Sequence, residues 1–448
     1  MSEHPVRLLL SDDLERDRLT VFFRLILAIP HFIWIALWGI AAFVAAIVNW
    51  IATVVLGRSP EALHGFLAAY VKYATQFYAY WHLAADPYPS FTGQDGYPVD
   101  VTIAAPVAQN RWTVALRGLL FLPSVLLAAP LAGVPGSSRL RKGNASLATS
   151  FGLLHTVALL GWFAILARGR MPRGLRDGAA YGLSYGAQFW AYAFLLTDRY
   201  PDSDPLAAVP DLPVRADPVH LELDDDLRRS RLTVFFRLLL ALPHLIWLEL
   251  WGILMLLCAI LNWFATLVAG RSPDRLHRFL AAYLRYANHV YAFLYLITNP
   301  FPGFVGKAGS YPFEIVVAPR QRQNRWKTGF RIVLAIPALI LTGAYGALAF
   351  VAALLGWFSS LARGRMPLGL RNAGALALRY QAQTHGYVLL LTDAYPYSGP
   401  VRDGGAADDA GLVPAAGAPS PEEAQPSAAA PMPDAPAPGG ALPDVGLS

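Results

Sequence analysis

The four-residue sequence Gly-Arg-x-Pro occurs four times in this chain, and its recurrence constrains the fold more than any other feature. Each copy ends the apolar part of a longer unit, and units one to four cover residues 18–89, 111–201, 231–302 and 325–396. Units three and four align without a gap. Such recurrence predicts a chain assembled from copies of one supersecondary element. The four copies begin at Gly57, Gly169, Gly270 and Gly364.

The composition predicts an integral membrane protein. Hydrophobic residues make up 55% of the chain, charged residues make up 15%, and the mean hydropathy is +0.39. These values are too apolar for an ordinary soluble domain. The first apolar run starts near Leu19 behind the acidic segment "SDDLERD", which is unlike a cleavable signal peptide. We therefore expect a multi-pass protein of the cell membrane with its N-terminus in the cytosol.

Charge is divided unevenly between the body of the chain and its end. The net charge is +6, and residues 400–448 hold seven acidic residues and one arginine, which leaves +12 on the remainder. The acidic end is rich in Ala, Pro and Gly, so we expect a disordered cytosolic tail. A protein partner for this tail stays open. The basic body favours the lipid bilayer and its anionic headgroups as partners over nucleic acid.

The units group into two membrane halves, each with predicted strands. We expect a first half over residues 1–201, a linker over 202–218, a second half over 219–396 and the tail over 397–448. A short run with period-two alternation precedes each unit and predicts a strand. Because one five-residue strand is unstable alone, we expect the four to form one small sheet outside the bilayer. The runs begin at Val6, Val99, Val219 and Phe313.

The apolar run of each unit predicts a membrane helical hairpin. Unit two carries a polar insertion, "GVPGSSRLRKGNAS" from Gly133, in the middle of its run, and such a segment cannot lie in hydrocarbon. We therefore expect each run to reach a surface near its middle, with helices at Arg18–Trp38 and Ile40–Leu56 in unit one. A reentrant hairpin that returns to the same side is the alternative. The expected hinges are Gly39, Gly252 and Gly346.

The Gly-Arg-x-Pro sequence predicts a sharp corner at the membrane surface. The glycine can cap the end of one helix, the arginine suits a helix C-terminus and lipid phosphates, and the proline starts the next helix. The helix that follows in unit one has apolar residues at intervals of three and four, with His64, Lys72 and Gln76 on another face. We expect this amphipathic helix to lie on the cytosolic interface. A third spanning helix is the alternative.

These patterns resemble a known bacterial membrane family, the one named only as domain of unknown function 4389. The resemblance rests on "RLTVFFRLILAIPHFIW" from Arg18, "NWIATVVLGRSP" from Asn49, and the closing sequences "LTDRYP" from Leu196 and "LTDAYP" from Leu391. It covers nearly all of residues 18–396 as tandem copies. Unit three departs from it, since "ITNPFP" places an asparagine where the acid is expected. The resemblance implies an integral membrane protein and supplies no catalytic chemistry.

Two polar pairs lie inside the apolar runs. His31 and Asn49 are nearly equally far from the expected hinge in unit one, so the hairpin predicts that they hydrogen-bond across facing helices. His244 and Asn262 repeat the pair in unit three, whereas units two and four lose both members. The simpler interpretation is an interhelical bond that sets the hairpin register. The functional interpretation is a proton or ion site.

Recurring arginines flank the apolar runs and predict a basic collar for anionic headgroups or another anionic ligand. Each such charge near an anionic surface contributes roughly 1 kcal/mol. The topology of the corners explains the same residues without a ligand. The eight arginines are Arg24, Arg58, Arg117, Arg170, Arg237, Arg271, Arg331 and Arg365.

Three classes of function remain after the motifs are considered. The sequence contains no Walker loop, HExxH or GxSxG motif, so we expect neither an enzyme nor a bound cofactor or metal. We favour a non-catalytic membrane platform or lipid-contacting assembly module. The alternative is a transporter or channel that uses the His and Asn pairs, because transporters often arise by internal duplication. An intramembrane enzyme is the least favoured class.

Overall fold

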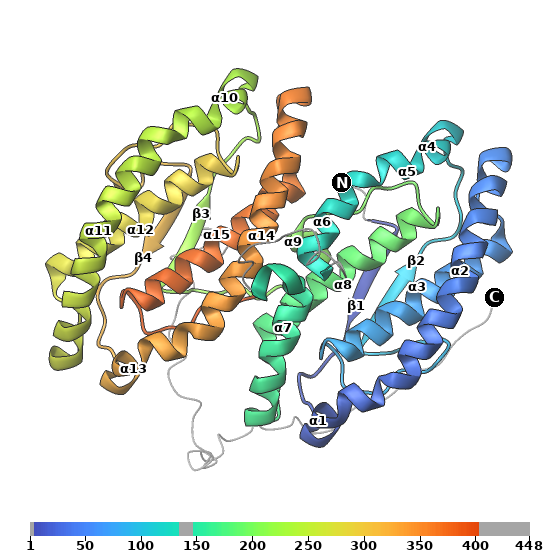
Figure 1. Ribbon diagram of the computed structural model, residues 1–448, viewed down its shortest axis with the longest axis horizontal. Coiled ribbons are helices and arrows are strands. Elements are labelled where there is room, and N and C mark those ends of the chain that lie inside the picture. Colours follow the sequence, from blue (N-terminus) through green and yellow to red (C-terminus); the bar gives the residue numbers. More distant parts are fainter. Residues whose placement is uncertain (1–3, 134–146, 403–448) are drawn as a thin grey trace, which may run out of the picture. The chain divides into compact units, whose positions relative to one another are not determined.

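The computed structural model describes residues 4–133 and 147–402, and its elements follow one another in a recurring order (Figure 1). That order is a short strand, a long apolar helical stretch, a corner and a second helix. Unit one contributes β1 (Val6–Leu10), α1 (Arg18–Leu27), α2 (Ile29–Leu56) and α3 (Glu61–Trp81). Residues 134–146 of the insertion and the tail from 403 lie outside the described residues, so the predicted disorder of the tail stays a prediction.

The other three units supply the remaining elements. Unit two has β2 (Val99–Ile103), α4 (Arg111–Ala115), α5 (Arg117–Leu120), α6 (Leu122–Ala132), α7 (Leu147–Arg168) and α8 (Arg173–Ala193), with α9 (Pro205–Ala208) after it. Unit three has β3 (Val219–Leu223), α10 (Arg231–Phe235), α11 (Arg237–Ala269) and α12 (Asp274–Leu294). Unit four has β4 (Phe313–Val317), α13 (Arg325–Gly329), α14 (Arg331–Arg363) and α15 (Leu368–Val388).

The long helical stretches, here called rods, are α1–α2, α4–α7, α10–α11 and α13–α14. Three of their helices, α2, α11 and α14, are long and apolar enough to cross a membrane. The predicted hairpins are wrong, because these helices run uninterrupted through Gly39, Gly252 and Gly346. A Cβ at Gly39 would lie 3.1 Å from the Tyr70 hydroxyl, and one at Gly252 would lie 3.3 Å from the Tyr283 hydroxyl. These two glycines therefore let a tyrosine of the second helix approach the rod.

The insertion in rod two explains why the hairpin prediction failed. α6 ends at Ala132, and the chain is non-helical at Gly152, where φ is 64°. A Cβ on Gly152 would lie 2.5 Å from the Gly133 backbone nitrogen. The chain therefore leaves the rod and returns to it at the same point. Such an insertion does not require the uninterrupted rods to bend.

The corners form as predicted. Gly57, Gly270 and Gly364 cap α2, α11 and α14 in the left-handed conformation, with φ of 78°, 69° and 68°. Gly169 has φ of 72° after the last residue of α7. Glycine populates this region without the steric cost of a Cβ. The proline of each corner is the N-terminal cap of the second helix.

Two separate sheets replace the single four-stranded sheet that we expected. β1 pairs with β2 and β3 pairs with β4, both antiparallel, with Val6 opposite Ile103 and Val219 opposite Val317. In the first half α8 packs on β1 and α3 packs on β2; in the second half α15 packs on β3 and α12 on β4. Each strand pair therefore has its own two helices to bury its apolar face, and no wider sheet is needed.

The second helices lie inside the protein. Sixteen of the 21 residues of α8 and 15 of the 21 residues of α15 are buried. In α3 the polar face packs on β2, where the Gln76 side-chain amide donates to Asp100 at 2.9 Å and the Lys72 ammonium lies 3.4 Å from the same carboxylate. The polar face that marks α3 as amphipathic therefore contacts a strand and not water. The placement of the second helices on a membrane interface stays a prediction.

Within each half the two rods run antiparallel and meet at both ends (Figure 1). α1 packs against α7 and α2 against α4, while α10 packs against α14 and α11 against α13. The start of each rod therefore lies beside the corner that ends the other rod of its half. Backbone bridges at these four places join Glu15 to Arg170, Arg58 to Ala108, Arg228 to Arg365 and Arg271 to Arg322.

Candidate functional site

Rods one and three bury mostly polar side chains and expose mainly apolar ones, whereas the buried face of rod four is mostly apolar. Glu249 in the middle of rod three is an exposed exception. In rod one Arg24, His31, Asn49 and Thr53 are at most 3% exposed, whereas Phe43 is 65% exposed. The buried positions are spaced by three, four, seven or eleven residues and so form one narrow stripe along the rod. Soluble proteins bury apolar side chains and expose polar ones. This surface therefore suits an apolar solvent such as the interior of a bilayer.

The two predicted polar pairs are not contacts. His31 and Asn49 lie 18 positions apart on the continuous helix α2, which separates them by about 27 Å at 1.5 Å per residue. His244 and Asn262 have the same spacing on α11. Their joint presence in units one and three has a different cause, because each residue binds its own partner.

The histidines bind tyrosines of the second helix. His31 Nδ1 lies 2.8 Å from the Tyr73 hydroxyl, and His244 Nδ1 lies 2.8 Å from the Tyr286 hydroxyl. Aromatic rings cover the rest of each imidazole, with the Phe91 ring stacked 4.4 Å from that of His31. Both histidines are 0% exposed. The contact therefore joins the rod to the second helix at a position without solvent.

The asparagines join the end of a rod to its corner and to the paired unit. The side-chain amide of Asn49 donates to the Phe194 carbonyl oxygen at 2.9 Å, and its oxygen accepts from the Ser59 hydroxyl at 2.7 Å. Ser59 occupies the variable position of Gly-Arg-x-Pro. In unit three the side-chain amide of Asn262 donates to the Leu389 carbonyl oxygen, and its oxygen accepts from the Ser272 hydroxyl.

Units two and four fill the space between the end of the rod and its corner with other residues. The rod has Gly161 or Gly356 in place of the asparagine, and the corner has Met171 or Met366 in place of the serine. A Cβ at Gly161 would lie 2.8 Å from the Met171 sulfur, so the methionine fills the space that the glycine leaves. The sequence carried this signal as a joint change of Asn with Ser and of Gly with Met. This signal involves the corner as well as the apolar run, so a comparison of the apolar runs alone does not reveal it.

A buried arginine near the start of each rod binds the end of the second helix of its own unit. Arg24 donates to the carbonyl oxygens of Tyr80 and Ala85 at 2.8 and 3.1 Å and to the Asp86 carboxylate at 2.7 Å. Its guanidinium group lies 4.2 Å from the centre of the Tyr80 ring. The aspartate of the closing sequence is thus an internal partner. Arg331 pairs with Asp393 in unit four, and Arg237 with Asn299 in unit three.

The predicted basic collar therefore divides into two sets. The first set is at most 4% exposed and held by internal partners, so the prediction that it binds headgroups is wrong; it comprises Arg24, Arg117, Arg237 and Arg331. The second set lies at the corners and is exposed, and the described residues provide its side chains with no hydrogen bond or ion pair. It comprises Arg58, Arg170, Arg271 and Arg365.

Another contact, which the sequence reasoning missed, closes each second helix. One leucine after each helix has a positive φ between 59° and 63°, a conformation that costs an L-residue roughly 1–2 kcal/mol. A buried side chain just ahead of a rod donates to its carbonyl oxygen and so holds the strained turn. The pairs are Arg16 with Leu83, Gln109 with Leu195, Arg229 with Leu296 and Gln323 with Leu390.

The fold and this contact network define a mainly helical protein with helices able to span a membrane and with polar groups turned inward. The chain belongs to the family described as Domain of unknown function (DUF4389), whose model matches residues 18–93, 231–305 and 325–398. These regions correspond to units one, three and four, and the match leaves unit two uncovered. Neither the curated proteins nor the solved structures contain a match to the chain.

Proposed function

We propose that the protein is a non-catalytic, lipid-contacting platform of a cell membrane, built from four copies of one unit. The observation that carries this proposal is the polarity of the rods. Most of their exposed side chains are large and apolar, with Glu249 of α11 as an exposed exception, while the buried polar side chains of rods one and three are bonded inside the protein. Lipid is the environment in which that distribution is stable.

The connections between strands and rods support rods that lie along the membrane. β1 and β2 are antiparallel, and seven residues lead from each strand to its rod, so the two rods of the half start at opposite ends. The sheet lies between the starts of the two rods. If the rods crossed the bilayer, the sheet would therefore lie within the thickness of the bilayer. Arg7 is exposed on β1, and a charge in hydrocarbon costs about 3 kcal/mol or more. Rods that lie along one face keep both sheets in water.

The length of the rods favours the same arrangement. α11 has 33 residues and extends about 50 Å, against a hydrocarbon thickness of about 30 Å. To keep its whole length within this thickness α11 would have to tilt by roughly 50°, outside the usual range of 0–40°. The exposed corner arginines at both ends of the rods would then meet headgroups of one leaflet, each contributing about 1 kcal/mol.

The intramembrane polar residues support a platform over a transporter or an enzyme. His31, Asn49, His244 and Asn262 are each 0% exposed, and each contacts a protein partner. A transport pathway requires such groups to line a water-filled route. Contacts that set the position of rods and corners account for both asparagine side chains and for Nδ1 of both histidines, whose Nε2 atoms are buried without a hydrogen bond from the described residues.

Labelling of single cysteines would test both the membrane contact and its geometry. In a Cys258→Ala background, Glu61→Cys and Arg173→Cys place thiols at exposed positions near opposite ends of the first half. Rods along one leaflet predict that a membrane-impermeant maleimide labels both from the cytosolic side. Labelling from opposite sides would show rods that cross the bilayer as single continuous helices. Leu257→Cys, which is exposed on α11, should react only after the membrane is dissolved, and Thr102→Cys on β2 is the water-exposed control.

Two further measurements test the transporter alternative and the role of the acidic tail. Ion flux in reconstituted vesicles that is lost when His31 and His244 are both replaced by alanine would favour the transporter. Pulldown with the full chain and with a chain lacking residues 403–448 would show whether the acidic tail recruits a protein partner, as expected if it faces the cytosol.

A further inference from the structure

The corner at Gly270, here called corner three, holds two arginines opposite each other. An antiparallel backbone bridge joins Arg271 of this corner to Arg322, which lies just ahead of rod four. Residues opposed in this way have Cβ atoms about 5 Å apart on one face, and like charges there destabilise the pair. Arg325 starts rod four, and its Nε atom lies 3.6 Å from the position of a Cβ on Gly270. Three arginines therefore meet where α13 packs against the end of α11 (Figure 1).

The side chains of these three arginines have no partner in the part of the chain that the structure describes. All three are exposed, and no hydrogen bond or ion pair within residues 4–133 and 147–402 involves them. Two acids border the corner, but each pairs with another cation: Asp274 lies 2.9 Å from Arg278, and Asp393 lies 2.8 Å from Arg331. More distant cations, at 3.9 and 3.8 Å from the same two carboxylates, are Arg320 and Lys327. Corner three therefore holds positive charge that its own acids do not compensate.

The other three corners are built differently. At their bridges the corner arginine faces an alanine, a glutamate, or an arginine that has an acid of its own. The bridges join Arg58 to Ala108, Arg170 to Glu15 and Arg365 to Arg228. The Arg228 Nε atom lies 3.8 Å from the Asp226 carboxylate. Two facing arginines without an acid of their own therefore distinguish corner three among the four.

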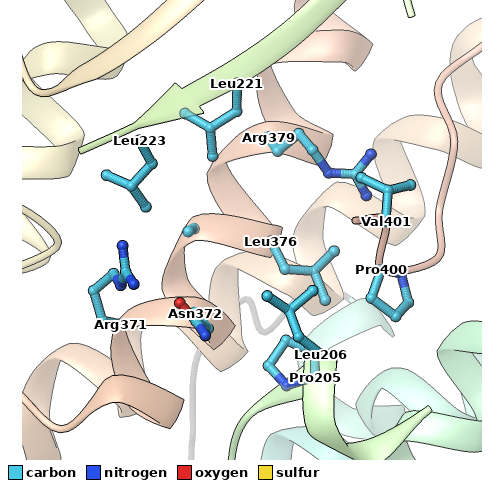
Figure 2. Close-up of a pocket in the computed structure, with 11 residues that line it drawn as sticks. Pro205, Leu206, Leu221, Leu223, Arg371, Asn372, Leu376, Arg379, Pro400 and Val401 are labelled. Atoms are coloured by element: carbon cyan, nitrogen blue, oxygen red, sulfur yellow. The ribbon is translucent and has the colours of Figure 1, made fainter. Parts of the chain in front are cut away.

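The arginines at the cavity beside α15 differ from those of corner three, because they have internal partners. In Figure 2 the side chains of Arg371 and Arg379 extend in different directions from this helix. Arg379 donates to the carbonyl oxygens of Tyr397 and Gly399, and Arg371 interacts electrostatically with Asp204. Positive charge at this cavity is thus already used by the fold.

An exposed aromatic ring lies next to the arginines of corner three. Trp326 follows Arg325 in α13 and is 79% exposed. Tryptophan side chains are enriched at the level of lipid headgroups, between hydrocarbon and water. Further along rod four the exposed side chains of Phe330 and Ile332 are apolar. If rod four contacts lipid as proposed above, the arginines of corner three therefore lie at the level of the lipid phosphates.

We propose that corner three binds the phosphate group of a membrane lipid and prefers a phosphate monoester. The inference rests on the proposed lipid contact for the source of the phosphate, and on the three arginines for the binding itself. Guanidinium groups bind phosphate through charge-assisted hydrogen bonds. A phosphate monoester carries a charge of about −1.5 to −2 at pH 7, whereas a diester carries a single charge. The monoester therefore compensates more of the positive charge at this corner.

Thermal unfolding of the purified full-length protein in detergent would test this site. The probes are dihexanoyl phosphatidic acid, a monoester, and dihexanoyl phosphatidylglycerol, a diester with the same acyl chains. Because a ligand of the folded state raises Tm, phosphatidic acid should produce a given increase at a concentration at least tenfold lower. Equal responses to the two lipids would overturn the preference for the monoester, and no response to phosphatidic acid would refute the site. An equal response to inorganic phosphate would overturn the lipid as the source.

The variant Arg322→Ala connects this response to corner three, since it installs the residue that faces Arg58 in unit two. Without lipid its Tm should be higher than that of the unmodified protein, because a pair of like charges is removed. Its response should require at least tenfold more phosphatidic acid. Arg170→Ala is the matched control, because it removes an exposed corner arginine that faces Glu15. Equal responses of the two variants would refute the site, and a lower Tm of Arg322→Ala without lipid would contradict the argument from repulsion.

The lipid site and the membrane platform can fail separately. Binding is measured in detergent, whereas the reactivity of Leu257→Cys in intact membranes tests the bilayer contact. A reactive Leu257→Cys thiol with an unchanged response to phosphatidic acid would refute the platform and support the site. An unreactive thiol with no response to phosphatidic acid would refute the site and support the platform.

Discussion

The Ser59 hydroxyl donates a hydrogen bond of 2.7 Å to the side-chain oxygen of Asn49, ten residues earlier in the chain. The amide of the same asparagine holds the carbonyl oxygen of Phe194 at the end of α8. One buried side chain thus fixes the angle between rod one and its corner and joins unit one to unit two. Units two and four have a glycine in place of the asparagine and a methionine in place of the serine. The space at this junction is therefore filled in two different ways.

Replacing Asn49 or Ser59 by alanine should each lower the free energy of unfolding by about 1–3 kcal/mol, because a buried polar partner is left unsatisfied. The double variant should lose less than the sum, with a coupling of about 0.5–3 kcal/mol, as residues in one network do. Unfolding by sodium dodecyl sulfate in mixed micelles measures these values. Additive losses would show that the hydrogen bond contributes nothing of its own; Thr102→Ala on β2 is the exposed control.

The buried Arg24 should be far more important than its acidic partner. Arg24→Ala removes two bonds to carbonyl oxygens and leaves Asp86 without its partner, which should cost about 3–5 kcal/mol. Asp86→Asn should cost about 1 kcal/mol, because unit three already uses Asn299 at this position with Arg237. Unfolding measurements on both variants test the ranking. An equal loss in the two variants would show that the ion pair, not the carbonyl bonds, dominates.

Arg16, the buried arginine ahead of rod one, should be replaceable by the glutamine that units two and four use, provided that its acidic partner is removed as well. Arg16 binds both the Leu83 carbonyl oxygen and Asp12, whereas Gln109 binds the equivalent leucine at a place without that acid. Arg16→Gln alone should therefore destabilise the protein by about 1–3 kcal/mol, because Asp12 is left buried without its partner. Adding Asp12→Ala should restore most of this loss, and a double variant as unstable as Arg16→Gln would contradict the argument.

His82 should make the stability depend on pH. Burial, with a smaller contribution from the neighbouring His155, lowers the pKa of His82 from 6.5 to about 3, while its ring nitrogen bonds to the Tyr78 carbonyl oxygen. The folded protein keeps this ring neutral, and the unfolded chain takes up a proton near pH 6.5. Stability from this group is therefore present above pH 6.5 and is lost as the pH falls toward 3, by up to about 1.4 kcal/mol per unit.

The variant His82→Gln isolates this effect, because its amide can still donate to Tyr78 but does not titrate. The free energy of unfolding of the two proteins should converge or cross as the pH is lowered from 7 to 4.5. A constant difference between them over this range would show that His82 binds no proton on unfolding.

Sequence patterns predicted the local elements well. The Gly-Arg-x-Pro corners, the four strands and the second helices all form at the expected residues, since each depends on local backbone preference and on periodicity. The family match confirms the resemblance in units one, three and four. The contact partners of single polar residues could not be predicted in the same way. His31 pairs with Tyr73 across 42 positions, and nothing in the local pattern distinguishes this from a pair with Asn49.

By itself, the sequence determined where the strands, the corners and the second helices form and which segments are apolar, because these properties follow from neighbouring residues. The tertiary structure decided that the rods are continuous, that the strands form two pairs, and that the polar face of α3 contacts a strand instead of water. It also separated the exposed Arg58 from the buried Arg24, which look alike in the sequence. The physical reason is that burial depends on which second helix and which paired rod reach a residue, and those partners come from distant parts of the chain.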